Sequence, residues 1–471
     1  MTDIREKFKR ALGDILVRVF FSEGGDVDPA YVKRPALAIA YSGGLDSSVL
    51  LHLAKEYASV RGMLLYAFHV HHGLSPNADA WLSHCDKECG RLGVRFESHR
   101  VTVSKEGGTG LEAAARVSRY AALGDMCRTH GIRLLLTAHH QDDQAETVLL
   151  QMLRGAGVAG LSGMDAANVA PALLGSTDIT LARPLLSLTR AELATCMAGL
   201  DASHIEDESN ADLHYSRNAL RHRIMPLLQE YFPGFQDRVA RSARHAQFAQ
   251  RILDQAAQAD WESCRENDWL RVDAVRNLDQ DRFSNVLRFW LGKRGLHMPT
   301  TAWLQQAREQ LLVAREDAQV CITLTDHEIR RYRNRIMLVP NTRHNVYENV
   351  LFTWCGEKRV CLSEYGGTLT FEMAKQGVDG DWLRGRSLEV RGYRGELRLK
   401  VAHDRPSRSL KLHFQERGIP AWERRQLPLL FSDGDLIYAA GIGMASRYLA
   451  EGDKTCIHIS WEPGSGLGTA S

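Results

Sequence analysis

The sequence lacks a long apolar segment and any cysteine pattern that would fix its environment. No apolar run reaches the ~18 residues needed to cross a bilayer, and the opening residues MTDIREKFKRAL mix both charges without an apolar stretch. The nine cysteines are odd in number, scattered and never spaced C-x-x-C, which argues against a disulfide framework and a zinc ribbon. We therefore expect a cytoplasmic protein with reduced thiols and no membrane partner.

The common nucleotide-binding motifs are also missing. The chain contains no G-x-x-x-x-G-K-[ST] loop of the Walker type. The run Gly155 to Gly160 satisfies G-x-G-x-x-G, but it follows an expected helix instead of a strand, so it lacks the context of a dinucleotide site. We interpret its glycines as the end of that helix and a loop near the sheet edge.

The chain has little net charge, +2 in 471 residues, so its composition does not mark it as a polyanion binder. Positive charge gathers instead between residues 384 and 425, with twelve Lys or Arg against five Asp or Glu. Four more arginines crowd just upstream: Arg330, Arg331, Arg333 and Arg335. Two interpretations stay open here, an ordinary solvated surface and a surface for nucleic acid.

The first half of the sequence alternates apolar β-like runs with helical stretches. The β-like runs cover residues 36–40, 63–70, 94–103 and 132–138, and the helical stretches cover 47–61, 77–92, 111–130 and a segment from 141. A fifth run at 179–182 precedes a helix that a Thr189/Glu192 capping box opens. This alternation predicts an α/β fold with a doubly wound parallel sheet.

Two regions of different pattern follow. Between residues 226 and 313 the apolar positions recur at helical spacing, with five aromatic residues as expected core anchors: Trp261, Trp269, Phe289, Trp290 and Trp303. After Asn341, short β-like runs are separated by glycines. We predict three domains: an α/β domain at 1–220, a mainly helical domain at 221–342 and a strand-rich domain at 343–471.

A glycine turn joins the first β-like run to the first of these helices, in the segment Tyr41-Ser-Gly-Gly-Leu-Asp-Ser-Ser48. Bare backbone at Gly43 and Gly44 lets N–H groups and the helix N-terminus approach a phosphate. A carboxylate beside a polyphosphate needs a cation between them, so Asp46 predicts a magnesium ion. A purely structural glycine turn is the alternative.

Acidic residues follow the run 132–138, in the segment His139-His-Gln-Asp-Asp-Gln-Ala-Glu146. This is the sheet end at which ligands bind in open α/β folds. On a helix, Asp142, Asp143 and Glu146 share one face. Such carboxylates hold magnesium or remove a proton from an attacking amine, whereas acids that only stabilise a helix N-terminus are the alternative. The adjacent histidines favour a functional site.

The glycine turn resembles the SGGxDS loop of the N-type (PP-loop) ATP pyrophosphatases, which split ATP between its α and β phosphates. Further stretches resemble one branch, the tRNA(Ile)-lysidine synthetases, and together they cover nearly the whole chain. They are His69 to Leu74, Glu112 to Tyr120, His139 to Thr147, Arg154 to Met164, Arg183 to Leu186, Glu206 to Asn210, Tyr215 to Arg221 and Lys411 to Arg424. Glu208 departs from the proline of many members, and residues 165–177 look like a variable loop.

The resemblance implies an ATP-dependent ligase that joins free lysine to C2 of the wobble cytidine in the CAU anticodon of isoleucine tRNA. An adenylated cytidine would be the intermediate, and AMP and pyrophosphate would be released. By resemblance, ATP would lie on Ser42, Gly43, Gly44, Leu45, Asp46 and Ser47, with Arg116 near its α-phosphate. Asp143, assisted by Glu146, would bind and deprotonate the amine, and Asp46 and Asp143 are the candidate magnesium ligands.

The resemblance also implies where the substrates bind. The lysine and tRNA side would be lined by His139, Asp142, Asn210, Arg217, Asn218 and Arg221. The excess of positive charge between residues 384 and 425 leads us to predict that the strand-rich domain binds the tRNA away from the anticodon. Whether the chain forms a homodimer stays open.

Two other functions stay open as well. A tRNA thiolation enzyme of the same superfamily would need paired cysteines for a cluster or persulfide. The nearest pair, Cys85 and Cys89, is spaced C-x-x-x-C on an expected helix. A non-catalytic RNA-binding module would keep the fold without the activity, although Ser42, Asp46 and Asp143 are all in place.

Overall fold

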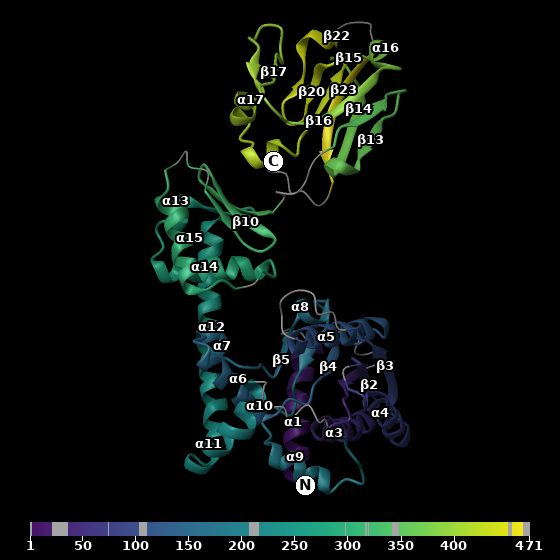
Figure 1. The fold of residues 1–471 in the computed structure, drawn as a ribbon, viewed down its shortest axis with the longest axis vertical. Coiled ribbons are helices and arrows are strands. Elements are labelled where there is room, and N and C mark those ends of the chain that lie inside the picture. Colours follow the sequence, from purple (N-terminus) through teal and green to yellow (C-terminus); the bar gives the residue numbers. More distant parts are fainter. Residues whose placement is uncertain are drawn as a thin grey trace. The chain divides into compact units, whose positions relative to one another are not determined.

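The computed structural model describes residues 2–20, 36–73, 75–102, 111–206, 216–296, 298–315, 318, 320–341, 348–450 and 455–464. Contacts divide the chain into two compact units (Figure 1). The first unit contains Met1–Ser263 and Asp281–Thr300, and the second contains Cys264–Gln280 and Thr301–Ser471. The division into three domains stays a prediction, since the contacts by themselves distinguish two units.

A six-stranded sheet forms the centre of the first unit, in the order β3-β2-β1-β4-β6-β5. Its strands are β1 (Ala36–Ala40), β2 (Leu64–His71), β3 (Arg95–Arg100), β4 (Leu134–Leu136), β5 (Ala167–Val169) and β6 (Thr180–Ala182). Neighbouring strands pair in parallel except β5, which runs antiparallel to β6. The predicted parallel sheet is confirmed, and β5 occupies part of the expected variable loop.

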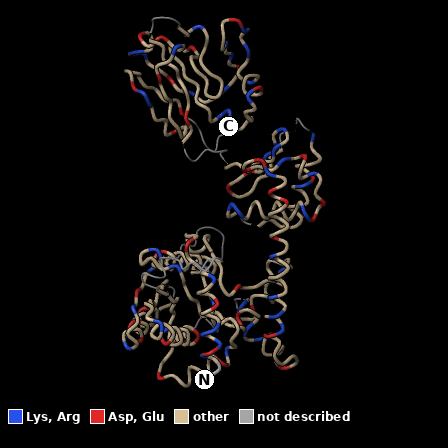
Figure 2. The backbone as a smooth tube through the Cα atoms, turned by 180° about the vertical axis from the view of Figure 1, so that it is seen from behind, with Lys and Arg blue, Asp and Glu red and all other residues tan. Residues whose placement is uncertain are grey.

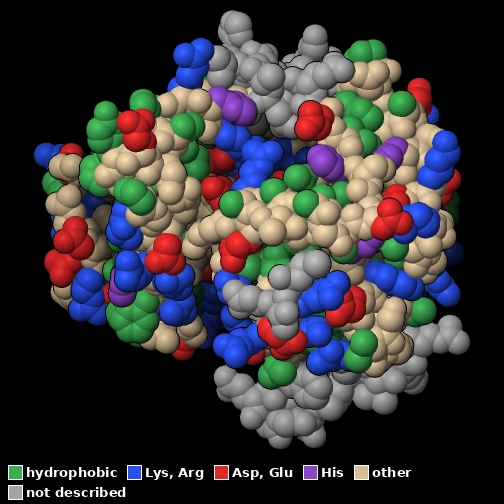
Figure 3. Space-filling view, turned by 90° about the horizontal axis from the view of Figure 1, so that it is seen from below, with side chains coloured by type: hydrophobic (Ala, Val, Ile, Leu, Met, Phe, Trp, Pro, Cys, Tyr) green, Lys and Arg blue, Asp and Glu red, His purple; other side chains and the backbone are tan. Residues whose placement is uncertain are grey.

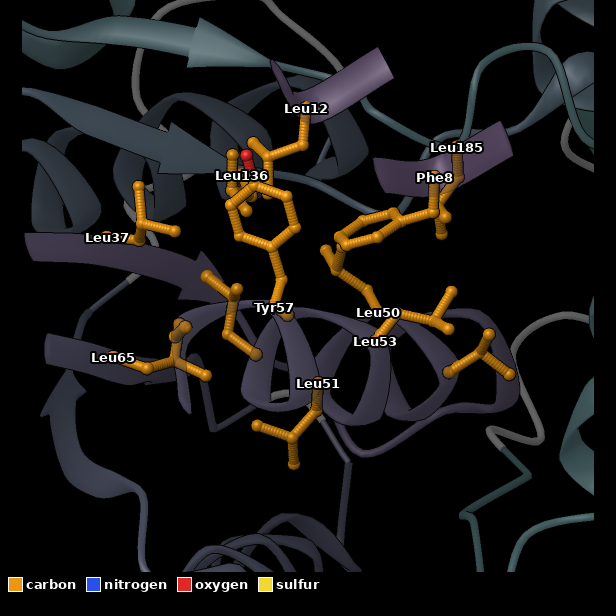
Figure 4. Packing of buried hydrophobic residues seen from close by; sticks show 14 of the residues in the cluster. Phe8, Leu12, Leu37, Leu50, Leu51, Leu53, Tyr57, Leu65, Leu136 and Leu185 are labelled. Carbon is orange, nitrogen blue, oxygen red and sulfur yellow. The ribbon is translucent and has the colours of Figure 1, made fainter. Parts of the chain in front are cut away.

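Helices cover both faces of this sheet, because successive strand residues point to opposite sides. Leu134 and Leu136 belong to one core cluster and Leu135 to the other. The helices are α1 (Thr2–Phe20), α3 (Leu45–Arg61), α4 (Ala78–Leu92), α5 (Leu111–Thr129), α6 (Gln141–Leu153), α7 (Val158–Leu161), α8 (Pro171–Leu174) and α9 (Arg190–Ala198). The alternation did not predict α1, which packs Phe8 against Tyr57 of α3 with ring centroids 6.3 Å apart (Figure 4).

A helical stretch continues the first unit. It contains α10 (Ser216–Ala219), a π-helical turn (Leu220–Ile224), α11 (Met225–Tyr231), α12 (Phe235–Cys264) and α14 (Gln280–Lys293). The rings of Trp261 and Trp290 stack 6.1 Å apart and both side chains are buried, as predicted. Trp269, Phe289 and Trp303 are only half-buried. Within the described part of the chain, no helix has the length and apolarity of a membrane span.

The second unit opens with α13 (Val272–Val275), α15 (Thr301–Val313) and a small antiparallel sheet in the order β7-β8-β11-β10-β9. The strands are β7 (Arg265–Glu266), β8 (Trp269–Arg271), β9 (Cys321–Thr323), β10 (His327–Tyr332) and β11 (Arg335–Pro340). The sequence analysis did not identify this sheet. Its hairpin turn contains Arg333 at a φ of 54° instead of a glycine, so the usual turn signal is absent.

The rest of the second unit is strand-rich, as predicted. One five-stranded sheet contains β12 (Val350–Thr353), β16 (Ser387–Gly392), β19 (Pro428–Ser432), β20 (Asp435–Ala439) and β21 (Gly443–Met444). The other contains β13 (Arg359–Leu362), β14 (Gly367–Ala374), β23 (Cys456–Pro463), β15 (Gly377–Asp379) and β22 (Leu449–Ala450). Shorter elements are α16 (Gly380–Leu383), α17 (Leu410–Glu416), α18 (Ala421–Arg424) and the pair β17 (Arg398–Leu399) and β18 (Arg408–Ser409).

Candidate active site

The glycine turn between β1 and α3 has a backbone that needs glycine. Gly43 has a φ of 84°, in the left-handed region, and a Cβ there would lie 2.6 Å from Cδ1 of Ile205. The backbone N–H of Ile205 also donates to the carbonyl of Gly43 at 2.9 Å. A distant segment therefore holds the turn in shape at the N-terminus of α3, where N–H groups have no partner within the helix.

Serine hydroxyls line the same turn. The exposed Ser42 and the buried Ser47 have their Oγ atoms 3.1 Å apart, and Ser47 Oγ donates to the carbonyl of Gly44 at 3.0 Å. Ser48 Oγ is turned inward and donates to the carbonyl of Gly43 at 3.3 Å. Ser42 and Ser47 are thus the hydroxyls of the turn that are placed for a ligand, while Ser48 stabilises the turn.

Asp46 lies in the first turn of α3, and its two carboxylate oxygens have different surroundings. Oδ1 is buried without a hydrogen-bond partner in the described structure, whereas Oδ2 lies 3.6 Å from Nε2 of His140. Leaving a buried carboxylate oxygen unpaired is unfavourable, so this atom fits a cation ligand. No group of three or more His, Cys, Asp or Glu side chains is placed for a metal among the described residues. Magnesium at Asp46 would therefore take other ligands from phosphates and water.

Both histidines lie in the connection from β4 to α6. Thr137 Oγ1 and His139 Nδ1 are 2.9 Å apart, and the backbone N–H of His140 donates to Asp143 Oδ2 at 3.1 Å. The buried side chain of His140 places Nε2 3.4 Å from the same Asp143 oxygen. His140 therefore connects the glycine turn with α6. The sequence analysis chose only His139 as a site residue, although the adjacent pair of histidines was the available signal.

Two arginines neutralise the carboxylates of α6. Arg217 Nε donates to Glu146 Oε2 at 2.9 Å, and Arg217 Nη2 donates to Asp143 Oδ1 at 3.3 Å. Arg221 Nη2 donates at 2.9 Å to each of these two acceptors. Glu146 is fully buried and Asp143 is 8% exposed, so the carboxylates of these ion pairs lie away from bulk water while both arginine side chains stay partly exposed. The residues predicted for the amine and those predicted for the RNA thus form one network.

Asp142 has different hydrogen-bond partners from Asp143 and Glu146. Its Oδ2 accepts from the backbone N–H of Arg190 at 2.8 Å, at the start of α9, and its Oδ1 accepts from Gln236 Nε2 at 3.4 Å. Asp142 therefore lines the same pocket as Glu146 but does not pair with the arginines that bind Asp143 and Glu146. A helix N-terminus with unpaired N–H groups is a strong competitor for a nearby carboxylate.

The close charges shift the pKa values of these groups. Burial alone would lower the pKa of His140, but its contact with Asp46 and the other neighbouring carboxylates raise that pKa above its ordinary value. Burial would raise the pKa of Asp143, yet the surrounding cations hold it below its ordinary value. Burial and nearby arginines lower the pKa of His139. With the arginines in place, Asp143 is an ionised carboxylate and a weak base.

A second cationic group lies on α5 and after β6. The guanidinium carbons of Arg116 and Arg119 lie 4.8 and 5.4 Å from the ring centre of Tyr120. Arg183 is buried and donates from Nη1 to the carbonyl of Asp165 at 2.8 Å, while its Nε has no partner in the described structure. Guanidinium groups without carboxylate partners suit an anionic ligand.

A pocket of about 220 Å³ opens beside the α6 carboxylates, and His140, Asp142, Glu146, Arg190, Arg221 and Gln236 contribute to its lining. Lys, Arg, Asp and Glu side chains gather in a recess near the middle of the face in Figure 3. Leu45 is the first residue of α3, and Asn218 lies half-buried in α10. The predicted substrate residue Asn210 lies outside the described residues.

Comparison with known proteins decides the family. The PP-loop domain model matches residues 7–228, the TilS substrate binding domain matches 270–337, and the TilS substrate C-terminal domain matches 388–461. A tRNA(Ile)-lysidine synthase from Burkholderia pseudomallei is 38% identical, covering 95% of this chain and 97% of its own length. The chain belongs to the tRNA(Ile)-lysidine synthase family.

Other members of the family show similar coverage. The synthase from Alkalilimnicola ehrlichii is 40% identical over 88% of this chain and 91% of its own, and that from Ralstonia nicotianae is 37% identical over 92% and 94%. A solved structure, the U34-tRNA thiolase NcsA from Methanococcus maripaludis with its [4Fe-4S] cluster, is 18% identical over 52% of this chain and 77% of its own, with a TM-score of 0.41. The family resemblance and the PP-loop domain predicted from the sequence are confirmed.

Proposed function

We propose that this protein joins the side-chain amine of free lysine to C2 of the wobble cytidine in the CAU anticodon of isoleucine tRNA. Codon recognition would change to AUA and identity from methionine to isoleucine. Family membership over nearly the whole chain supports the reaction. The observation that carries the proposal is His140, whose Nε2 lies 3.6 Å from Asp46 and 3.4 Å from Asp143. One site can therefore serve both half-reactions.

In the first half-reaction, O2 of the cytidine would attack the α-phosphorus of ATP, and pyrophosphate would leave. The backbone N–H groups and hydroxyls of the turn from Ser42 to Ser47 are suited to the departing phosphates. Arg116 would contact the α-phosphate, because its guanidinium has no carboxylate partner among the described residues. Asp46 would hold magnesium through Oδ1, which has no partner among the described residues, and the ion would neutralise phosphate charge.

In the second half-reaction, the lysine amine would attack C2, AMP would leave with O2, and one amine proton would pass to a carboxylate. Free lysine has a pKa of ~10.4, so a base is required near neutral pH. We assign this role to Asp143, with Glu146 beside it. In the present arrangement their two negative charges face the positive charges of Arg217 and Arg221, so a lysine ammonium meets no net attraction.

We propose that Arg217 and Arg221 leave the carboxylates when tRNA binds. RNA phosphates offer guanidinium groups an equally good bidentate partner, and the exchange would free Asp143 and Glu146 for the amine. Arg221 lies in the π-helical turn, a distortion that is frequent at functional sites. Asn210 and Asn218 are assigned to the same substrate side. Lysine would then bind after the tRNA.

The three-domain division at 220 and 342 and a tRNA-binding role for residues 343–471 are proposed as well. Several arginines of the basic region pair with acids, namely Arg386 with Asp433, Arg391 with Glu389 and Arg408 with Glu416. Exposed Lys400, Arg405 and Lys411 have no ion pair with any residue that the structure describes, which supports the role. The local excess of charge in the sequence therefore overstates the free positive charge.

Trp422 is not placed to stack on an RNA base. The guanidinium carbon of Arg330 lies 5.0 Å from the centre of its ring, and the ring of Tyr332 meets it edge-on at 6.0 Å. These contacts join β10 to α18 inside the second unit. They favour a packing role for the tryptophan.

The thiolation alternative is disfavoured by the state of the cysteines. Cys85 and Cys89 are both buried, and burial raises the pKa of each thiol to about 12. A persulfide carrier works as the thiolate in an accessible place. Neither cysteine meets that requirement.

The test is mass spectrometry of nucleosides from a CAU-anticodon isoleucine tRNA transcript treated with the protein, ATP, magnesium and lysine. We expect the wobble cytidine to gain one lysine less one water, with AMP and pyrophosphate released. A parallel reaction without ATP is the control. A sulfur-containing nucleoside would instead support thiolation. An unmodified but tightly bound tRNA would support a non-catalytic module.

A further inference from the structure

The first half of α12 is a basic segment that none of the three matched family domains covers. The matched ranges end at residue 228 and resume at 270, whereas α12 spans Phe235–Cys264. Between Arg238 and Arg251 the chain has four arginines and no Asp or Glu. The arginine positions along this helix are blue in Figure 2.

Three of these arginines and one aromatic residue form a stripe on the helix. Arg241, Arg244, Phe248 and Arg251 are spaced three, four and three residues apart, which places them on one side of an α-helix. All four are exposed, and the Phe248 side chain is 59% exposed. The guanidinium carbon of Arg251 lies 5.8 Å from the ring centre of Phe248. We call these four residues the α12 stripe.

The stripe lies on a helix that is fixed beside the active site. Gln236 donates to Asp142 of the pocket, and Gln247 Nε2 donates to the carbonyls of Ser162 and Met164 at 2.9 and 3.1 Å. Ten residues separate the ends of the stripe, a length of about 15 Å at the rise of an α-helix. A duplex-like strand presents about four phosphates over that length.

We propose that the α12 stripe binds the sugar-phosphate backbone of the RNA whose base enters the active site. This inference rests on the proposed function, since it takes the RNA substrate from it. The arginines have no carboxylate partner among the described residues, and guanidinium groups bind phosphates through bidentate hydrogen bonds. Phe248 adds a ring on which a ribose or an unstacked base can lie. A second copy of this chain fits less well, because three like charges would face each other across a symmetric contact.

The test uses the full chain with Arg241, Arg244 and Arg251 all changed to Gln. The control variant changes Arg10, Arg18 and Arg61 to Gln, which removes the same charge from exposed positions on α1 and at the far end of α3. Equilibrium binding of the isoleucine tRNA is measured across a sodium chloride series without lysine. We expect the stripe variant to lower the slope of log affinity against log salt by about 2 to 3, at ~0.7–0.9 per phosphate, with no change for the control.

Equal slopes and affinities for the stripe and control variants would overturn the inference. A changed oligomeric state in the stripe variant, with RNA binding intact, would also overturn it and assign the stripe to self-association. ATP affinity within twofold of the parent chain shows that the variants are folded. Because the assay needs no catalysis, a parent chain that binds RNA through the stripe but makes no lysidine would refute only the proposed function.

Discussion

Asp46 and the pair Asp143 and Glu146 are carboxylates of one site in opposite states. Asp46 has a buried oxygen without a hydrogen-bond partner in the described part of the chain, while Asp143 and Glu146 are paired with two guanidinium groups. His140 contacts both Asp46 and Asp143, so these carboxylates lie close together although their partners differ. Under the proposed function, this difference would leave the phosphate loop ready for a cation, whereas the amine site would stay blocked until its two arginines bind another anion.

The largest effect is expected from a substitution of Asp46 at the phosphate loop. Changing Asp46 to Asn removes the charge that would hold magnesium, so we expect adenylation to fall by at least ~10²–10³, the cost of losing one oxyanion-hole hydrogen-bond donor in other enzymes. Release of pyrophosphate from ATP in the presence of tRNA measures it. Wild-type release by the mutant would show that Asp46 does not serve the phosphates.

Changing Asp143 to Asn removes one of the two carboxylates that bind Arg217 and Arg221. Loss of a general base typically costs 10²–10⁴ in rate, so we expect lysine transfer to slow by about 10² while adenylation is much less affected. Rapid-quench sampling should then reveal accumulating adenylated tRNA. Equal losses in both steps would move Asp143 from the amine to the magnesium site.

Removing one of the arginines that bind Asp143 and Glu146 should lower the stability of the folded state. Arg221→Met leaves the buried Glu146 short of a partner, and we expect the free energy of unfolding to fall by about 3 kcal/mol in urea titrations. The control is Arg223→Met, an exposed residue of the same π-helical turn, with a change of no more than about 0.5 kcal/mol.

The same Arg221→Met variant tests whether the arginines keep lysine from binding to Asp143 and Glu146. With one guanidinium gone, the carboxylates regain net negative charge, so calorimetry should detect tighter binding of free lysine without tRNA than in the parent chain. Unchanged lysine affinity would mean that the arginines do not compete with the amine.

The second unit supplies a weaker electrostatic effect. Changing Lys400, Arg405 and Lys411 to Gln should lower the salt slope of tRNA binding by about 2, while ATP affinity stays the same. Point variants suit this test better than a truncation after Asn341, which would also remove the contacts of Trp422 with Arg330 and Tyr332. A slope equal to that of the parent chain would leave this surface without a role in RNA binding.

The smallest effect concerns a largely buried carboxylate that has no ionic partner among the described residues. Burial raises the pKa of Glu423 from 4.5 to about 7. The folded state then holds a proton that the unfolded state has lost, so stability from this group is complete below pH 4.5 and is lost as the pH rises to about 7. We expect the free energy of unfolding to fall by about 1–2 kcal/mol between these pH values, after a reduction for solvent screening of the partly exposed side chain. Glu423→Gln should flatten the pH dependence, and the exposed Glu396→Gln should not.

Local sequence determined the phosphate loop and the acidic helix. A buried strand, two glycines and a helix start in this order predict a turn whose backbone can approach a phosphate, and these residues are neighbours in the sequence. The contact of Gly43 with the distant Ile205 was not predictable in this way. The Thr189/Glu192 capping box was likewise predictable, and Thr189 Oγ1 accepts from the backbone N–H of Glu192 at 3.2 Å.

Only the tertiary structure decided how the charges pair. Arg217 and Arg221 follow the α6 carboxylates by 71 to 78 residues, and Arg386 precedes its partner Asp433 by 47. No local period links residues so far apart, and each guanidinium has several carboxylates within reach of a flexible chain. The hydrogen bonding of Asp142 was decided in the same way, because its Oδ2 accepts from the backbone N–H of Arg190 at the N-terminus of α9. Helix periodicity sets which residues share a face, but the partner on that face depends on packing between distant segments.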